Sequence, residues 1–157
     1  MAHAESASET YTVTVDYSIR PEYDLLRKFF DWVSDGYKEG RDWQRDERCK
    51  DVPTEGSREV TFLHMHFNQV MTTEQALSQL DAKGLRPVTL EELVCFARKN
   101  PDLQKEFPIA GLGSCRWYDY RRVPYLFWRG RERYLYLRWS EPDHRWREYD
   151  RFLVVRK

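Results

Sequence analysis

Hydrophobic and polar residues alternate in several short stretches of the chain, with the two-residue period of a half-buried β-strand. Near the N-terminus Tyr11, Val13, Val15 and Tyr17 are separated by threonine and aspartate. Later stretches have the same character, and the last of them is expected to pair with an inner or N-terminal strand. The pattern predicts strands at residues 10–17, 60–67, 123–128, 133–139 and 152–156, with a hairpin loop at 129–132 in a C-terminal β-meander.

Two helices are predicted by capping boxes, in which a threonine and a glutamine or glutamate three residues later satisfy each other's backbone N–H groups. Thr72 with Gln75 begins the first helix, which ends at Gly84. Thr89 with Glu92 begins the second, which ends near residue 100 before a proline.

The N-terminal third carries weaker signals. Residues 21–36 begin with proline and place large apolar residues at helical spacing, which predicts a helix up to Gly36. Residues 36–57 are charged and turn-rich without an apolar period, which predicts a long surface loop.

Together these elements predict an α+β fold with a mixed antiparallel sheet, two to three helices and a β-rich C-terminal half. At 157 residues the chain has the usual length of one domain. We expect a single domain over residues 1–157, in which residues 1–9 are flexible, residues 10–58 add a strand, a helix and a loop, and residues 60–157 form the core.

Composition narrows the class of protein. Hydrophobic residues make up 41% and charged residues 33%, the balance of an ordinary globular protein. The longest stretch without a charge or histidine, 108–115, is far too short for a membrane span, and the N-terminus lacks the pattern of a signal peptide. Three cysteines without C-x-x-C spacing predict neither disulfides nor zinc. We expect a cytoplasmic protein with no membrane contact and no cofactor.

Charge and aromatic residues are distributed unevenly. Residues 1–115 hold 14 basic and 20 acidic side chains, whereas residues 116–157 hold 12 basic and 6 acidic ones with four of the six tryptophans and six of the ten tyrosines. Arg, Tyr and Trp are enriched where proteins bind partners. A small β-rich domain also needs aromatic residues for its core, so composition alone leaves both interpretations open.

One strand makes the binding interpretation specific. In residues 133–140 the alternation predicts Leu135, Leu137 and Trp139 on the core face, since exposing large apolar side chains is unfavourable. The opposite, outward face and the loop that follows would then present a recognition surface. Its residues are Tyr134, Tyr136, Arg138, Ser140, His144, Arg145, Arg147 and Tyr149. The alternative is a cross-strand aromatic ladder that serves only the sheet.

Other candidate sites are weaker. His64 and His66 share one face of a strand and could chelate a metal, but hydrogen-bonded structural histidines are the favoured interpretation. No catalytic set and no metal-ligand set can be identified, so we expect a protein that is not an enzyme.

Four short segments carry a resemblance to a known family. They are GLRPVTLEEL at 84–93, IAGLGS at 109–114, VPYL at 123–126 and RFLVVRK at 151–157. Together they resemble the variable proteins of diversity-generating retroelements. The resemblance implies a C-type-lectin-like fold, shared with formylglycine-generating enzymes, and a C-terminal coding segment in which an error-prone reverse transcriptase rewrites adenines.

The resemblance also implies which positions are diversified. They would be the outward residues named above together with Tyr118, Asp119 and Tyr120, whereas codons without adenine, such as those for tryptophan, stay unchanged. The sequence then predicts a non-enzymatic ligand-binding protein with a hypervariable C-terminal surface, whose partner is a macromolecule, preferably a protein. The alternative is a nucleic-acid-binding protein that uses the basic, aromatic C-terminal region.

Overall fold

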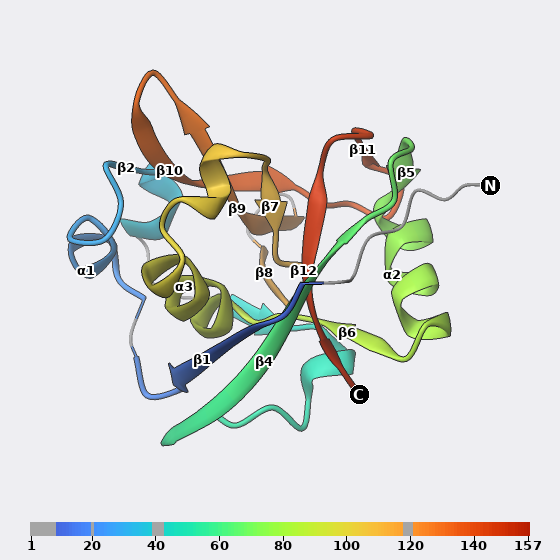
Figure 1. The fold of residues 1–157 in the computed structure, drawn as a ribbon, viewed down its shortest axis with the longest axis horizontal. Helices are drawn as coiled ribbons and strands as arrows, with labels where there is room; N and C mark the ends of the chain where they lie inside the picture. Colours follow the sequence, from blue (N-terminus) through green and yellow to red (C-terminus); the bar gives the residue numbers. More distant parts are fainter. Residues whose placement is uncertain (1–8, 20, 39–42, 118–120) are drawn as a thin grey trace.

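The computed structural model describes residues 9–19, 21–38, 43–117 and 121–157, and Figure 1 shows how their elements are arranged. The prediction for residues 1–8 lies outside this part of the chain. No helix within these ranges is long and apolar enough to cross a membrane. In chain order the elements are β1 (Tyr11–Asp16), α1 (Tyr23–Leu26), β2 (Trp32–Val33), η1 (Asp35–Lys38), β3 (Trp43–Arg45), η2 (Glu47–Cys49), β4 (Ser57–His66), β5 (Met71–Thr72), α2 (Thr73–Ala82), β6 (Leu85–Pro87), α3 (Leu90–Lys99), η3 (Leu103–Lys105), β7 (Ile109–Ala110), β8 (Ser114–Trp117), β9 (Arg121–Arg129), β10 (Glu132–Trp139), β11 (Arg145–Trp146) and β12 (Arg151–Arg156), where η marks a 3-10 helix.

The described residues form an α+β fold built on one ten-stranded, mostly antiparallel sheet. Its main order is β1-β4-β12-β7-β9-β10-β2, with β6 beside β12 and with β8 beside β9 and β3, while β5 and β11 pair separately. The C-terminal strand β12 thus lies between β4 and β7 in the middle of the molecule (Figure 1). The predicted pairing of this strand with an inner strand is confirmed. The predicted meander is confirmed for β8, β9 and β10, which pair antiparallel in chain order, whereas β12 leaves it and inserts between β4 and β7.

Two apolar cores lie on opposite faces of the sheet. α3 packs with the first core and α2 with the second (Figure 1). The alternation along β4 divides its side chains between them: Val60 and Phe62 belong to the first core, Leu63 and Met65 to the second. From Phe62 to Met65 both faces of β4 are therefore buried, whereas the alternating pattern predicts a half-buried strand.

Both predicted capping boxes are present. The backbone N–H of Gln75 donates to Oγ1 of Thr72 at 3.1 Å, and that of Glu92 donates to Oγ1 of Thr89 at 3.3 Å. The chain leaves α2 through Gly84, whose φ of +72° suits glycine. Local sequence signals thus set where α2 and α3 begin and where α2 ends.

The helix predicted for residues 21–36 is wrong in extent. Only Tyr23–Leu26 is α-helical, and Trp32–Val33 forms β2, which runs parallel to β10 beside Tyr134 and Leu135. A single helical turn gains little by itself, whereas pairing on the β10 edge satisfies backbone groups and buries Val33.

The surface loop predicted for residues 36–57 is also wrong in part. Its described residues include η1, β3 and η2, and β3 pairs with β8. Tyr37, Cys49 and Val52 are buried in the first core. Three separated apolar residues among many charges leave no periodic signal, so their burial could not be predicted from the pattern.

Candidate functional site

The candidate surface is built on the hairpin of β9 and β10. The two strands pair in register from Arg129↔Glu132 to Arg122↔Trp139. Gly130 and Arg131 connect them with φ of +56° and +72°. Two positive φ values in a two-residue loop match the right-handed twist of the strands, so the predicted hairpin is confirmed.

The two faces of β10 follow the predicted alternation up to Arg138. Leu135 and Leu137 are buried in the first core, while Tyr136 on the opposite face is 37% exposed. Tyr134 and Arg138, on the same face as Tyr136, are half-buried. A strand buried on one side therefore presents this face to solvent.

The predicted alternation fails at the end of β10. Trp139 is 41% exposed, and Ser140 is fully buried, so the predicted facing of both residues is wrong. β10 ends at Trp139, and the N–H of Ser140 then donates to the carbonyl of Arg121 at 2.9 Å. The Arg122 guanidinium lies 5.3 Å from the centre of the Trp139 ring. The chain leaves the sheet here, and the period-2 rule ceases to apply.

Four aromatic rings form a continuous cluster on the outward face, called the aromatic cluster below. Tyr134 lies between Phe127, at 4.7 Å between ring centres, and Trp32, at 5.0 Å. Tyr136 lies 5.7 Å from Trp32 and 5.8 Å from Phe127. Such contacts fix the orientation of rings that remain partly exposed. The sequence pattern did not indicate Trp32 as a site residue, because it predicts a helix over residues 21–36.

A buried pair ties the segment after β10 to this face. The hydroxyl of Tyr125 donates to a carboxylate oxygen of Asp150, and the N–H of Arg147 donates to the other oxygen at 2.9 Å. The Arg138 guanidinium lies 5.1 Å from the centre of the Tyr125 ring. Burial, and then the charge of Asp150, raise the pKa of Tyr125 well above its usual value. The phenol therefore stays protonated and holds Asp150 in place.

A groove of about 480 Å³ runs beside the aromatic cluster, between the outward face and residues 104–108. Of the predicted set, Tyr136, Arg138 and the 51% exposed Tyr149 line it. The Lys105 ammonium group lies 4.8 Å from the centre of the Trp128 ring at the same groove. The groove thus combines aromatic walls with basic side chains. Residues 104–108 were not among the candidate site residues, and nothing in their sequence pattern indicated a role in a site.

The other predicted site residues are placed differently. His144 is half-buried with its ring 5.1 Å from that of Trp146, and burial together with the charge of Arg138 lowers its pKa. Arg145 and Arg147 are exposed on the segment that follows β10. Tyr118, Asp119 and Tyr120 lie outside the described residues. The structure therefore brings Tyr134, Tyr136, Arg138 and Tyr149 together around the aromatic cluster and the groove.

The two histidines of β4 have structural partners. Arg151 donates to Nδ1 of His64 at 3.2 Å, and the Tyr11 hydroxyl lies 3.4 Å from its Nε2. Nε2 of His66 donates to the carbonyl of Glu148 at 2.8 Å. The prediction of hydrogen-bonded histidines is confirmed. Among the residues that the structure describes, no group of three or more His, Cys, Asp or Glu side chains could hold a metal ion.

Neither the family models nor the curated proteins nor the solved structures that were compared with this chain give a match.

Proposed function

We propose that this chain is a non-enzymatic binding protein that holds a macromolecular ligand, preferably a protein, on the aromatic cluster and the adjoining groove. In this proposal it is a variable protein of a diversity-generating retroelement with a C-type-lectin-like fold. The observation that carries the proposal is the outward face of β10, where Tyr136 and its neighbours stay partly exposed on a strand whose other face is buried.

The chemistry of this surface suits protein recognition. Tyrosine and tryptophan offer large contact area with few rotatable bonds, and the cluster already restrains those bonds before a ligand arrives. Arg138 adds a planar set of donors beside the rings. Less conformational entropy is then lost on binding, which favours affinity.

The arrangement of elements supports the proposed fold. Strand β4 is followed by the helices α2 and α3 and by a β-rich C-terminal half that ends in β12, which pairs antiparallel with β4. That is the order of strand, two helices and strands that the resemblance implies for residues 60–157.

A diversified surface also needs a scaffold that tolerates substitution. Exposed residues usually change stability by about 0.5 kcal/mol or less when replaced, whereas buried ones cost far more. Tyr136 and Tyr149 belong to the first kind, and Leu135, Leu137 and Trp146 to the second. Replacement of the exposed set would therefore alter the ligand without unfolding the protein.

Sequencing tests the proposal directly. The 3′ end of the gene is sequenced from many sibling cells together with the neighbouring genome. We expect mixed residues at positions 134, 136, 138 and 149, constant residues at 135, 137 and 146, and a near-copy repeat beside a reverse-transcriptase gene. Uniform codons at positions 134, 136, 138 and 149, with no near-copy repeat and no reverse-transcriptase gene nearby, would contradict the proposal.

A second candidate, nucleic-acid binding, is favoured by the basic groups beside exposed rings at the groove. Lys105 lies over Trp128, and Arg129 and Arg138 line the same groove. Cations on phosphates with rings stacked on bases would bind a single strand. Affinity for a labelled oligothymidylate should then fall steeply as salt rises, because binding releases counterions. An oligothymidylate that does not bind even at low salt eliminates this candidate.

A further inference from the structure

A second cavity, of about 660 Å³, lies beside the first half of β4. It is lined by four consecutive residues of that strand, 58–61, by Arg86 of β6, by the last residues of the chain and by residues of the segment 48–53. Figure 1 places this region at the end of the molecule away from the β9–β10 hairpin. We call it the β4 slot, and it takes no part in the surface described above.

The edge of β4 is open along this slot. On one side β1 pairs with β4 over its whole first part, from Phe62 opposite Tyr11 to Ser57 opposite Asp16. On the other side β12 pairs with β4 only as far as Phe62, opposite Val155. No other strand of the described residues pairs with β4. Residues 57–61 thus form a strand with a neighbour on one side only.

The direction of the unpaired backbone groups follows from the ladder. The N–H of Tyr17 donates to the carbonyl of Gly56 at 2.8 Å, so the even-numbered residues of β4 exchange hydrogen bonds with β1. Odd-numbered residues point the other way, as Leu63 and Met65 do toward β12. The N–H and C=O of Glu59 therefore point away from β1, into the slot.

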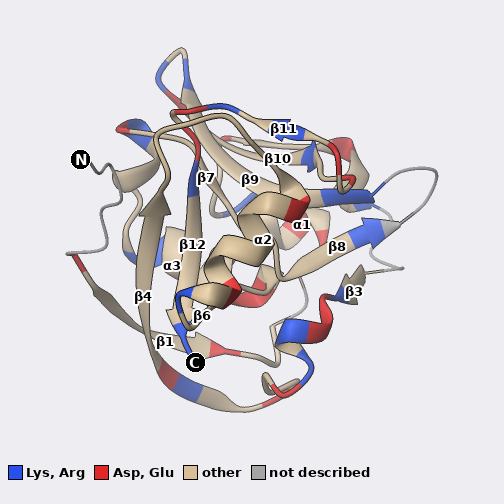
Figure 2. Ribbon diagram, turned by 90° about the vertical axis from the view of Figure 1, so that its right-hand side faces the viewer, with Lys and Arg blue, Asp and Glu red and all other residues tan. Residues whose placement is uncertain are grey.

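Charge around the slot is mainly positive. Its cationic side chains are Arg48, Arg58, Arg86, Arg156 and Lys157, against two carboxylates, Asp51 and Glu59. Figure 2 shows basic residues near the start of β4, on η2 and at the end of β12. Three of the cations already have a carboxylate partner: Arg86 pairs with Glu92, Arg48 with Asp46 and Lys157 with Asp81.

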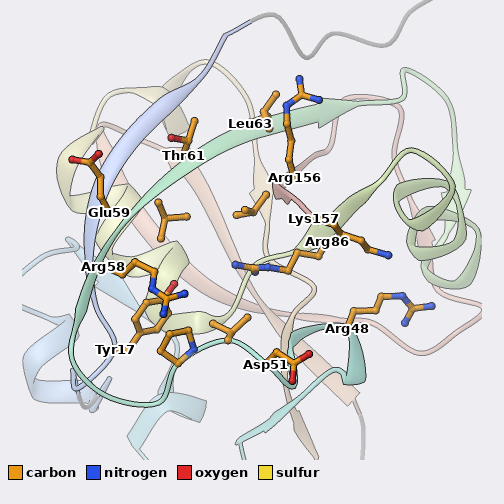
Figure 3. A pocket seen from close by; sticks show the side chains of 14 residues that line it. Tyr17, Arg48, Asp51, Arg58, Glu59, Thr61, Leu63, Arg86, Arg156 and Lys157 are labelled. Atoms are coloured by element: carbon orange, nitrogen blue, oxygen red, sulfur yellow. The ribbon is translucent and has the colours of Figure 1, made fainter.

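Arg58 and Arg156 are the two cations of the slot without a carboxylate partner, because no ion pair joins either of them to another described residue. In Figure 3 the side chains of Arg58 and Arg86 point toward one another over Tyr17, whereas Glu59 points away from the cavity. In this view Arg156 crosses β4 beside Leu63, with its guanidinium directed away from Arg58 and Arg86. Arg58 therefore lies at the open edge, and Arg156 lies beside the adjoining part of β4 that pairs with β12.

Apolar side chains complete the lining. Val52, Val60 and Leu63 are buried, and Val155 is half-buried. Charges on an edge strand often serve only to prevent aggregation. Here the edge is recessed beside the 48–53 segment over an apolar lining, so the cavity has the elements of a binding site: backbone donors and acceptors, apolar contacts and unpaired cations.

We propose that the β4 slot binds an extended, acidic segment of a partner protein, which adds to β4 as a further strand in line with β12. Main-chain hydrogen bonds to Glu59 align the segment, and its carboxylates pair with Arg58 and Arg156. Strand addition of this kind derives affinity from the backbone and specificity from side chains. This binding is independent of the proposed function of the C-terminal surface.

The test uses the full chain and a fluorescein-labelled heptapeptide of alternating valine and glutamate as the probe. Binding is followed by fluorescence anisotropy, and a peptide of alternating valine and lysine is the matched probe control. We expect saturable binding of the acidic peptide and at least about tenfold weaker binding of the basic one. Equal binding of the two peptides, or no binding of the acidic one, overturns the proposal.

Two variants locate the contact. Glu59→Pro removes the N–H that points into the slot without removing a hydrogen bond to β1, and Glu59→Thr removes the charge but keeps the N–H. We expect the proline variant to bind the acidic peptide about tenfold more weakly and the threonine variant to bind it undiminished. Both variants are checked for folding by circular dichroism and melting temperature. Undiminished binding by a folded proline variant would refute strand addition.

The charge contribution is tested by Arg58→Glu with Arg156→Glu, which should abolish binding of the acidic peptide. Lys28→Glu with Lys99→Glu makes the same change in net charge at exposed positions elsewhere and should leave binding intact. The double variant Tyr136→Ala with Tyr149→Ala should also bind the acidic peptide as the wild type does. Loss of peptide binding in that variant would assign the peptide to the groove beside the aromatic cluster and overturn the proposal. An oligothymidylate provides a further check. If it displaces the peptide and itself binds the Glu59→Pro variant undiminished, the slot is a phosphate-binding surface and the proposal is overturned.

Discussion

The hydroxyl of Tyr17 donates a 2.6 Å hydrogen bond to Oε2 of Glu92, which joins the end of β1 to α3. Arg86 donates two further bonds to the same carboxylate, at 3.0 and 2.9 Å. Glu92 is fully buried, and burial alone would raise its pKa. The hydrogen bonds and charge of Arg86, with the bond from Tyr17, outweigh burial and hold the pKa of Glu92 below its usual value. This buried carboxylate therefore connects β1, β6 and α3.

Removing that charge should be costly. We expect Glu92→Gln to lower the free energy of unfolding by about 3 kcal/mol, because Arg86 would lose its anionic partner in a largely buried place. Urea denaturation at neutral pH measures the loss. The matched control is Glu91→Gln on the same turn of α3, which should cost less than about 1 kcal/mol. Equal losses in the two variants would show that the buried pair is not what stabilises this junction.

The same carboxylate predicts an acid response. A lowered pKa in the folded state stabilises the protein above the ordinary pKa of glutamate, about 4.3, and this contribution is lost as pH falls through the folded value. We therefore expect the stability of the wild type to decline below about pH 4.3 more steeply than that of Glu92→Gln. Urea midpoints measured across this range provide the comparison, and parallel curves would contradict the assignment.

Buried tyrosines predict an alkaline response of opposite sign. Burial is the main cause that raises the pKa of Tyr17, Tyr37 and Tyr125, and it contributes with Glu9 to raise that of Tyr11 to about 12. The folded chain then holds protons that the unfolded chain releases near pH 10, so stability should fall as pH rises above about 10. Ultraviolet titration of folded protein should show a class of tyrosines that ionises only on unfolding. Ionisation of all ten tyrosines together near pH 10 would contradict it.

The outward face of β10 should tolerate truncation. Tyr136→Ala with Tyr149→Ala should change the free energy of unfolding by about 1 kcal/mol or less, since both side chains are substantially exposed. Leu135→Ala, one residue away on the buried face, should cost about 2–5 kcal/mol. Thermal and urea denaturation of the wild type, the double tyrosine variant and Leu135→Ala measure these losses. A large loss in the tyrosine variant would place those rings in the core and remove the basis for a binding surface.

Gly113 predicts a steric effect. A Cβ at this position would overlap the carbonyl of Val88, which accepts the N–H of Gly113 at 2.7 Å, and would come too close to the Cys49 sulfur. We expect Gly113→Ala to destabilise the protein by about 2 kcal/mol or more, because the obstacle is backbone. Gly111→Ala meets only the side chains of Val88 and Leu93 and should cost less. A smaller loss at position 113 than at 111, measured by melting temperature, would show that the bend can shift.

Several elements could be predicted because their signals are local. The capping boxes at Thr72 and Thr89, the alternation along β4 and the short loop around Gly130 act through residues within a few positions of one another. The buried face of β10 at Leu135 and Leu137 follows from the same short-range pattern. Each of these features depends on propensity and periodicity, which are written in adjacent residues.

The remaining features depend on contacts between residues far apart in the chain. Trp32 joins the aromatic cluster through pairing with residues about a hundred positions later, and Lys105 and Tyr149 line the same groove although they lie far apart in the chain. The open edge of β4 exists because β12 stops pairing opposite Phe62. No periodic pattern records such pairings, since their energy comes from backbone hydrogen bonds and burial that arise only when distant segments pack together.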